Sequence, residues 1–535
     1  HSLQDHSFPV FQKQNSSVKK PNRSETMDLN HLLHNPIILS VLLITIPLFF
    51  LLKIRRQPNK KLNLPPAPPA LPLIGNLHQV GAVPYRNLKH LADKYGSLML
   101  LRFGAVPTLV VSSAQAAEEI TRDHDVVFAD RPRLTVANVF FFGWSDLAFC
   151  PYGEYWRQVK KICVLELLSQ KRVQGFDFVR EEETDKLIAE ISAAGRKGEA
   201  VDLSESLVSI SNNIVSRSAL GRTYTKSEDG ELSSGDLVRT SLALVGGFCF
   251  KDFFPFLGFV DTLRGFNARV RKASKALHDF LDRVIEEHEK ANLQGNKSNV
   301  GSADRKDIID ILLQLEREGK LGINLTRENM KAVVMDMFIG GTDTTASSMD
   351  WAMAEMIKNP TILKKAQEEV RKVVGKKPKV EESDLDQMSY LRCVIKETLR
   401  LHVSGIIPRQ TTSDVKIDGY DIPANTRVFI NTWAIQRDPK QWERPEEFDP
   451  ERFVGSELDF RGQHKEYLPF GTGRRICPGI SYALREVEYV VANLLYLFDW
   501  RLPGGARGQD MDMTDNYDMV IRRKMPLVVV PTLHN

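Results

Sequence analysis

The chain has few of the residues that would tie it into a disulfide-bonded or zinc-bound framework. Its 535 residues include only five cysteines, and no two of them form a CxxC or CxxxC pair. An odd number of widely spaced cysteines argues against a disulfide framework and against a structural zinc site. We therefore expect the chain to work in a thiol-reducing compartment.

The chain also lacks a strong excess of charge of either sign. A formal net charge of +4 gives no reason to expect a nucleic-acid partner. No internal repeat is apparent, and from about residue 80 the pattern is mostly helical. Strand-like stretches are short, at residues 96–113, 415–433 and 522–532. These observations predict one large domain that is mainly α with a minor β part.

The start of the chain divides into three segments by composition. Residues 1–26 precede Met27 and are interpreted as an upstream-translated or non-native leader. Residues 27–52 contain an uncharged stretch, 36–52, which is about 25 Å long as a helix and near the lower limit for a bilayer span. Basic residues follow this stretch but do not precede it after Met27, which predicts a membrane anchor with the main body in the cytosol. A buried core helix and a cleaved signal peptide are the alternatives. Residues 53–79, basic and then rich in proline, are expected to form a stiff hinge.

The most unusual predicted helix covers residues 325–358 and ends at an Asn-Pro pair. It would be about 50 Å long, enough to cross a whole domain. Its middle, GGTDTT at residues 340–345, forms helix poorly, because glycine costs helical stability and threonine bonds back to the preceding turn. A break at the surface is the simple interpretation. The functional interpretation is a kinked groove in a buried helix, in which Asp343 and Thr344 supply an acid and a hydroxyl for proton delivery.

A second unusual stretch, PFGTGRRICPGI at residues 469–480, surrounds Cys477 with glycine, arginine and proline. A lone cysteine is usually a small buried hydrophobe. The alternative is a loop built around a thiolate, which needs hydrogen-bond donors and nearby positive charge to stay deprotonated.

Two shorter stretches are weak signals on their own. KETLR places Glu397 and Arg400 three residues apart on one helical face, and FDPERF contains Arg452. Such charges usually form solvated surface pairs of little energetic value.

Taken together and in order, GGTDTT, KETLR, FDPERF and PFGTGRRICPG resemble the motifs of the cytochrome P450 superfamily. The last stretch fits the haem-loop pattern F-x-x-G-x-R-x-C-x-G. With the N-terminal apolar stretch, the hinge LPPAPPALPLIGN and stretches such as FADRP and YGEYWRQVKKIC, the chain is similar to the plant A-type microsomal members. The resemblance implies the cytochrome P450 fold, with one large haem domain over residues 80–535, a long central helix and an N-terminal transmembrane helix.

The resemblance also implies roles for individual residues. Cys477 would be the axial thiolate on the iron of haem b. Asp343 and Thr344 would be the catalytic pair, with the adjacent Thr345 pointing elsewhere on the helix. Glu397, Arg400 and Arg452 would form a buried ion network near the haem. The residues expected to bind the cofactor are Cys477, Arg475, Phe470, Gly473, Gly479, Trp156, Lys160 and Arg409.

Two of these positions depart from the family pattern. Lys160 stands where we expect arginine, so it keeps the charge but loses the forked geometry. The segment LHVSGIIPRQ before and around Arg409 is shorter than usual, which leaves the position of Arg409 and the shape of the pocket open.

The function implied is a haem-thiolate monooxygenase of the endoplasmic reticulum membrane, single-pass, with its catalytic domain in the cytosol. It would take electrons from NADPH through cytochrome P450 reductase and insert one oxygen atom from O2 into an apolar small molecule, such as a terpenoid or phenolic. A basic face formed by Arg157, Lys160, Lys161 and Arg474 is either the reductase docking surface or ordinary solvated surface. The alternatives are a haem-thiolate isomerase or dehydratase that needs no O2, and a non-catalytic haem scaffold.

Overall fold

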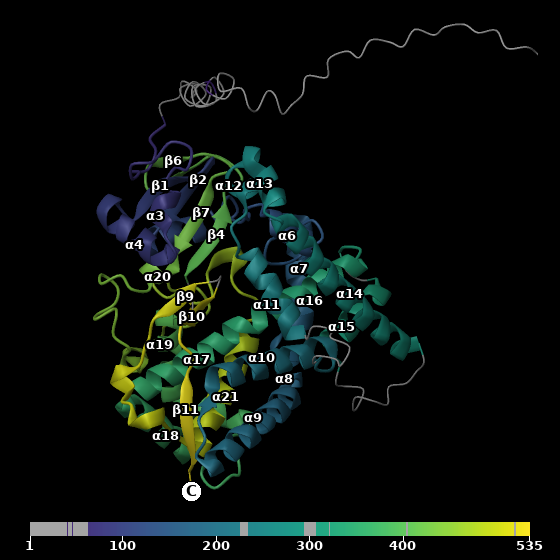
Figure 1. Cartoon of the computed structure of the whole chain (residues 1–535), viewed down its shortest axis with the longest axis vertical. Coiled ribbons are helices and arrows are strands. Elements are labelled where there is room, and N and C mark those ends of the chain that lie inside the picture. The colour runs from purple at the N-terminus through teal and green to yellow at the C-terminus, as the bar shows by residue number, and fades with distance from the viewer. Residues whose placement is uncertain are drawn as a thin grey trace, which may run out of the picture. The chain divides into compact units, whose positions relative to one another are not determined.

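The computed structural model describes residues 62–224, 234–293, 306–319, 322–402, 405–517 and 520–534, together with Ser40 and Thr45 (Figure 1). The predicted leader, and the predicted anchor apart from Ser40 and Thr45, lie outside the described residues. The account below concerns the larger unit of the chain, residues 63–535. Within the described ranges no single helix is long and apolar enough to span a bilayer. Gly235–Phe253 and Pro255–Leu263 meet the criterion only as a pair bent by 108°.

Helices make up most of the described structure, as the sequence predicts (Figure 1). The α-helices are α3 Leu77–Val80, α4 Pro84–Tyr95, α5 Ala114–Glu118, α6 Thr135–Phe140, α7 Glu154–Ile162, α8 Gln170–Gly175, α9 Asp177–Lys197, α10 Leu203–Leu220, α11 Ser234–Val245, α12 Phe250–Phe253, α13 Gly258–Leu263, α14 Phe266–Leu293, α15 Ile308–Glu318, α16 Arg327–Gly341, α17 Asp343–Lys358, α18 Pro360–Val374, α19 Ser389–His402, α20 Thr432–Ile435 and α21 Ile480–Leu497.

The strands form small sheets, in the three regions where short strands are predicted and in a few further places. The strands are β1 Leu98–Phe103, β2 Val106–Val111, β3 Val201–Asp202, β4 Ile406–Gln410, β5 Val415–Ile417, β6 Tyr420–Ile422, β7 Arg427–Asn431, β8 Phe498–Arg501, β9 Asp515–Tyr517, β10 Ile521–Arg523 and β11 Val528–Leu533. The largest sheet has the order β1-β2-β7-β4, with β2 and β7 parallel and its other pairs antiparallel. Helix α4 packs on this sheet through Leu88 and Ala92.

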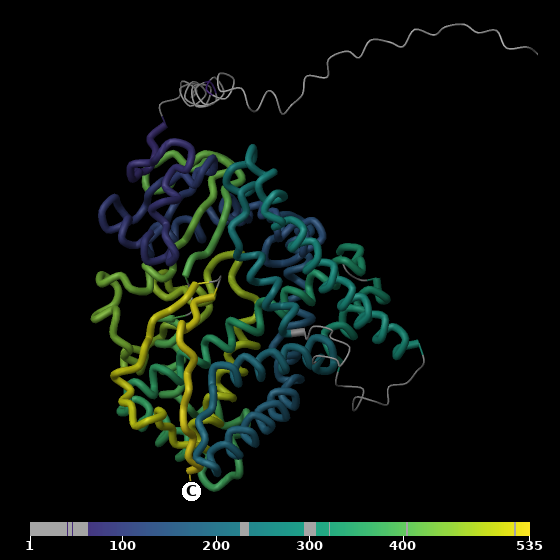
Figure 2. Tube along the Cα trace, in the orientation of Figure 1, coloured from purple at the N-terminus to yellow at the C-terminus, as the bar shows by residue number. Residues whose placement is uncertain are grey.

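The end of the chain folds back onto its first half. Strand β11 pairs with β3 and with β8, and it also contacts α9. In Figure 2 the yellow C-terminal trace accordingly runs beside the blue trace of α9. The hairpin of β9 and β10 precedes β11, and β10 contacts α17.

The long central helix is present but is divided at its predicted weak point. Helix α16 begins with a capping box between Thr326 and Asn329 and ends at Gly341. Thr342 has φ −81° and ψ −73°, and α17 begins at Asp343. Helix α17 packs against α10, α19 and α21, and its residues 345–357 are all buried. The sequence GGTDTT is therefore a break inside the core, and the surface-break interpretation is wrong.

The two glycines before the break have different surroundings. A Cβ added to Gly341 would lie 2.9 Å from Cγ2 of Val215 on α10, whereas a Cβ added to Gly340 would meet nothing within 4 Å. Valine is stiff at χ1, so its methyl group cannot easily swing away. Gly341 therefore allows α16 and α10 to pack closely, and Gly340 borders open space.

This difference predicts the relative stability of two otherwise identical substitutions. Both Gly340→Ala and Gly341→Ala gain helix propensity, but only the second overpacks the contact with α10, so we expect it to be less stable by about 1–3 kcal/mol. Urea unfolding followed by circular dichroism measures the difference. Equal stability of the two variants would contradict the close contact. Val215→Ala should lower the free energy of unfolding by less in the Gly341→Ala variant than in the parent protein, because there it also relieves the overpacked contact.

Candidate functional site

A cavity of about 400 Å³ lies where the break between α16 and α17 faces the loop that leads into α21. Two stretches that are singled out in the sequence and lie more than a hundred residues apart therefore line the same space. The lining includes Gly340, Gly341, Thr344 and Thr345 from the helices, and Phe470, Arg475, Cys477 and Gly479 from the loop.

Cys477 is the only one of the five cysteines that lines this cavity; the other four are buried elsewhere. Its backbone N–H donates to the carbonyl of Phe470 at 3.0 Å, and a Cβ on Gly479 would lie 3.8 Å from its sulfur. Burial raises the pKa of the Cys477 thiol, while the Gly479 backbone N–H and the charge of Lys160 act against that rise. A metal ion bound to the sulfur would lower the pKa of this thiol, because a coordinating thiol is deprotonated outright.

Three arginines gather at one side of the cavity, Arg409 and Arg475 buried and Arg131 half-buried. Arg131 and Arg475 line the cavity, and Arg409 lies beside them on β4, opposite Val428. Burial is the main cause that lowers the pKa of each guanidinium to about 9, and the neighbouring arginine charges add to it. Within the described ranges, none of the three forms an ion pair with a carboxylate. The group therefore carries positive charge that no direct ion pair neutralises, although the nearby carboxylates of Asp125, Asp130 and Asp146 partly offset it.

Among these arginines, Arg409 is the one that keeps buried donor atoms without a partner. All three side-chain nitrogens of Arg475 donate to backbone carbonyls, those of Ala129 at 2.7 Å, Leu147 at 3.1 Å and Cys150, whereas Arg409 donates only through Nη2, to the carbonyl of Thr472 at 2.8 Å. Nε and Nη1 of Arg409 are buried and have no partner among the described residues. Unpaired buried donors of like charge fit a ligand with more than one acidic group. The two propionates of haem meet that requirement, so the residues present fit the group.

Trp156 and Lys160 on α7 stand beside the same arginine group. The Trp156 indole N–H donates to the carbonyl of Leu147 at 3.0 Å, and its ring centroid lies 4.2 Å from Cζ of Arg475 and 5.2 Å from Nζ of Lys160. Lys160 lines the cavity and donates to the carbonyl of Arg474. Burial, with the charges of Arg475 and Arg409, lowers its pKa to about 8. The lysine thus brings its charge to the cavity wall, although its ammonium group already donates to the loop.

Gly473 is the candidate whose surroundings differ most from the expectation. It does not line the cavity. It has φ 68°, and a Cβ there would lie 2.8 Å from the carbonyl of Thr121 and from the Asp125 carboxylate. Its role is therefore to make the turn of the loop against the segment after α5, whereas Gly479 is the glycine next to the sulfur.

Arg131 is a site residue that the sequence reasoning missed. It belongs to the stretch FADRP, which served only as part of the family resemblance. Arg131 donates to the carbonyls of Ala148 at 3.0 Å and of Pro408, next to Arg409. The signal that could have found it is an arginine between an aspartate and a proline, directly after the apolar stretch VVFA.

The acid and the hydroxyl at the helix break face different ways. Thr344 lines the cavity and its Oγ1 donates to the carbonyl of Gly340. Thr345 also lines the cavity, and its buried hydroxyl has no partner within the described residues. The expectation that only one of the two threonines faces the site is therefore wrong. Asp343 does not line the cavity; its Oδ2 accepts a hydrogen bond from Arg522 at 2.7 Å.

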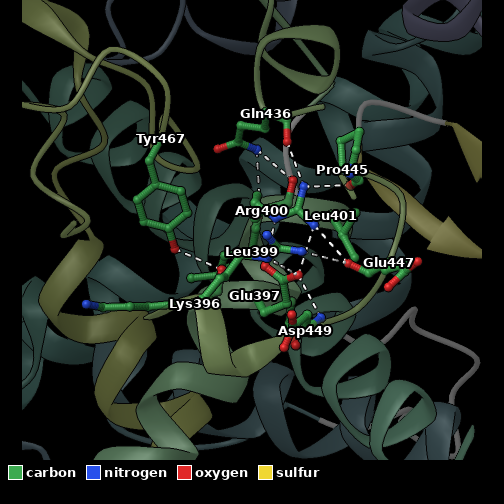
Figure 3. Close-up of polar contacts among 12 residues, drawn as sticks. Lys396, Glu397, Leu399, Arg400, Leu401, Gln436, Pro445, Glu447, Asp449 and Tyr467 are labelled. Carbon is green, nitrogen blue, oxygen red and sulfur yellow. Dashed lines mark hydrogen bonds and ion pairs between the residues drawn. The ribbon is translucent and has the colours of Figure 1, made fainter. Parts of the chain in front are cut away.

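Glu397, Arg400 and Arg452 come together away from solvent, as Figure 3 shows for the first two. Arg400 holds both oxygens of Glu397, at 2.7 and 2.9 Å, and Arg452 holds one of them at 2.9 Å. The side chains of Glu397 and Arg400 are 0% exposed. Arg400 also donates to the backbone carbonyls of Gln436, Pro445 and Glu447 (Figure 3). Glu397 and Arg400, which look like a surface pair when their motif is taken alone, thus form a buried bidentate pair. Arg400 also connects α19 to the loops after α20.

Comparisons with known proteins agree with this geometry. The family model described as Cytochrome P450 matches residues 65–529. Among curated proteins, cytochrome P450 71A1 of Persea americana is 50% identical over 93% of this chain and 99% of its own length. The phenylacetaldehyde oxime monooxygenase of Prunus mume is 46% identical, over 89% of this chain and 90% of its own. A zebrafish cytochrome P450 structure with abiraterone superposes with a TM-score of 0.70 at 26% identity, over 85% of this chain and all of the other.

The ion network predicts a strong dependence of stability on one carboxylate. Glu397→Gln keeps the shape of the side chain but removes the carboxylate charge that pairs with the buried Arg400 and the partly buried Arg452, so the free energy of unfolding should fall by about 3–5 kcal/mol. Urea unfolding followed by circular dichroism measures it. Asp279→Asn, in an exposed pair with Lys275 on α14, is the matched control and should change little. Comparable effects of the two substitutions would contradict the buried network.

Proposed function

The chain belongs to the cytochrome P450 family and is a haem-dependent monooxygenase, and from this premise we propose that Cys477 is the residue that ligates its haem iron. The observation that carries the assignment is that Cys477 alone among the cysteines lines the cavity. The haem supplies the chemistry by which O2 is activated, with the thiolate favouring O–O cleavage. The chain's own residues hold the cofactor, exclude water and deliver protons.

We assign the acidic edge of the cofactor to Arg131, Arg409 and Arg475, with Trp156 and Lys160 beside them. Each propionate would neutralise buried positive charge and satisfy donors such as Nε and Nη1 of Arg409. Phe470, half-buried against Phe460, would shield the sulfur from water.

The reaction consumes one molecule of O2 and one of NADPH for each substrate molecule. One oxygen atom enters a C–H bond of the substrate to give a hydroxyl group. The other oxygen atom is reduced to water. It takes up two electrons and one proton from NADPH and a second proton from solvent. Protons must therefore cross a cavity wall that is mostly apolar. Thr344 is part of that wall. Asp343 precedes it in the sequence and lies outside the cavity lining. We propose that Thr344 holds a proton or a water there and that Asp343 supplies it.

Electrons would come from NADPH through cytochrome P450 reductase at the basic face near α7. Part of that face is already neutralised, since Arg157 pairs with Glu154 and Arg474 with Asp125. Lys161 is exposed. The remaining charge supports docking through a small patch rather than through a broad basic surface.

The substrate proposed is an apolar small molecule of plant secondary metabolism. The cavity wall is mostly apolar away from the arginines, with Met337, Leu399 and Ile407 among its residues. Relatives are named for chemistry on small aromatic molecules, among them the oxime monooxygenase of Prunus mume and the psoralen synthase of Ammi majus. We further propose a single N-terminal anchor in the endoplasmic reticulum membrane, on the sequence of residues 27–52.

An isomerase or dehydratase that needs no O2 is the alternative that the sequence alone leaves open. It would have no use for a hydroxyl and an acid at the helix break, so the pair of Asp343 and Thr344 favours the monooxygenase. NADPH oxidation in the presence of the reductase distinguishes the monooxygenase from an isomerase or dehydratase and from a scaffold, because neither of those would consume NADPH.

Removing the Cys477 sulfur tests the assignment of the iron ligand. Cys477→Ala should abolish the strongly red-shifted Soret band of the reduced CO complex, because that band depends on a thiolate ligand. Alanine at Cys150, Cys163, Cys249 or Cys393 should leave the band in place. A normal band in Cys477→Ala would refute the assignment.

Removing the Thr344 hydroxyl tests proton delivery. Thr344→Ala should leave the CO spectrum intact, while product falls about 10–100-fold and hydrogen peroxide rises for the same NADPH consumed. Thr345→Ala is the matched control at the neighbouring cavity-lining hydroxyl and should do much less. Unchanged product per NADPH in Thr344→Ala would end this role, and a large loss only in Thr345→Ala would transfer it to Thr345.

A further inference from the structure

The C-terminal hairpin of β9 and β10 is fastened to one face of α17. Ser347 Oγ and Trp351 Nε1 both donate to the carbonyl of Ile521, at 2.7 and 3.0 Å. Arg522 Nη2 donates to Asp343 Oδ2 at 2.7 Å. The helical residues of these bonds are spaced by four, so they lie in one row along the helix. The backbone of β10 therefore contacts α17 at Ile521, and the Arg522 side chain reaches the first residue of the helix, Asp343.

The contact between Arg522 and Asp343 is an ion pair at the start of this row. The Asp343 side chain is only 5% exposed, and the Arg522 side chain is 35% exposed. No second cation forms an ion pair with Asp343 among the described residues. A charge-assisted bond to a buried carboxylate is strong, and a lone buried carboxylate would have to find another partner or another rotamer.

The hairpin itself is held from its other side. Tyr85 Oη and Arg86 Nη2, on α4, both bind Asp515 Oδ2, at 2.7 and 2.6 Å. Asp515 lies opposite Arg523 in the register of the hairpin, next to the pair formed by Arg522 and Asn516. The backbone that carries Arg522 is thus fixed at both edges, so the guanidinium has a defined place from which to hold Asp343.

We propose that Arg522 is a positioning residue for the monooxygenase reaction: it fixes the Asp343 carboxylate beside the helix break, so that protons reach Thr344 efficiently. The inference rests on the proposed roles of Asp343 and Thr344. Asp343 and Thr344 are neighbours in sequence, but only Thr344 lines the cavity. The orientation of the acid is therefore set from outside the cavity, by a strand 179 residues further along the chain.

A purely structural ion pair would also join the hairpin to α17, and the two roles differ in what they change. A structural pair affects stability and cofactor content. A positioning residue affects how the consumed NADPH is divided between product and hydrogen peroxide, while the CO spectrum stays unchanged. It also loses its effect when the acid that it positions is removed.

The experiment compares Arg522→Gln, Arg522→Lys, Asp343→Asn and the double variant Arg522→Gln/Asp343→Asn in the haem-loaded full chain with reductase. The probe is the best-converted member of a panel of apolar aromatic compounds that includes phenylacetaldehyde oxime. Arg523→Gln is the matched control, because Arg523 is on the same strand and bonds the Asp512 carbonyl instead of Asp343. Product and hydrogen peroxide are measured per NADPH.

We expect Arg522→Gln to lower product per NADPH by about 3–10-fold with an unchanged CO spectrum. Arg522→Lys should restore most of it, Arg523→Gln should behave as the parent, and the double variant should match Asp343→Asn. A loss in Asp343→Asn with normal coupling in Arg522→Gln would overturn this inference alone, as would additive losses in the double variant. Normal coupling in Asp343→Asn would overturn the proposed role of the acid, and this inference with it.

Discussion

Positive charge held away from water without a directly paired carboxylate is the constraint on which the site depends. Arg131, Arg409 and Arg475 are held by backbone carbonyls, and burial together with their mutual repulsion lowers their pKa values. Such an arrangement costs free energy until an anionic group is bound. The haem propionates would supply that group. Binding of the cofactor is therefore expected to stabilise this part of the fold. The loop around Cys477 contributes one of these arginines, which links the charge balance to the position of the sulfur.

The wall of the cavity formed by α16 and α17 depends on an interruption of regular structure. Gly341 lets α16 approach α10, the helix breaks at Thr342, and α17 resumes with Asp343. The break places the hydroxyl groups of Thr344 and Thr345 on the wall, which Asp336 and Ser348 also line, and leaves Asp343 facing away from it, toward Arg522. Two features that weaken a helix, glycine and threonine, are therefore what give the wall its chemistry.

The sequence predicts the parts of the site that lie in short continuous motifs. Local patterns mark the Cys477 loop and the helix break, and periodicity gives the mainly α fold, but the burial of Glu397, Arg400 and Arg452 follows only from the resemblance of the ordered motifs to a known family. The contacts of Arg131 and Arg522 could not be predicted, because each depends on residues more than a hundred positions away and no local pattern marks them. Gly473 shows a third kind of limit: its motif was found, but the neighbour that requires glycine there, Thr121, appears only in three dimensions.

The central claim is that one cofactor joins the Cys477 sulfur to the arginine group across the cavity. An experimental structure of the haem-loaded protein tests it most directly. The account predicts iron bonded to Sγ of Cys477, with at least one propionate oxygen within hydrogen-bond distance of Nε or Nη1 of Arg409. Iron bonded to another residue, or propionates that contact none of Arg131, Arg409 and Arg475, would contradict it.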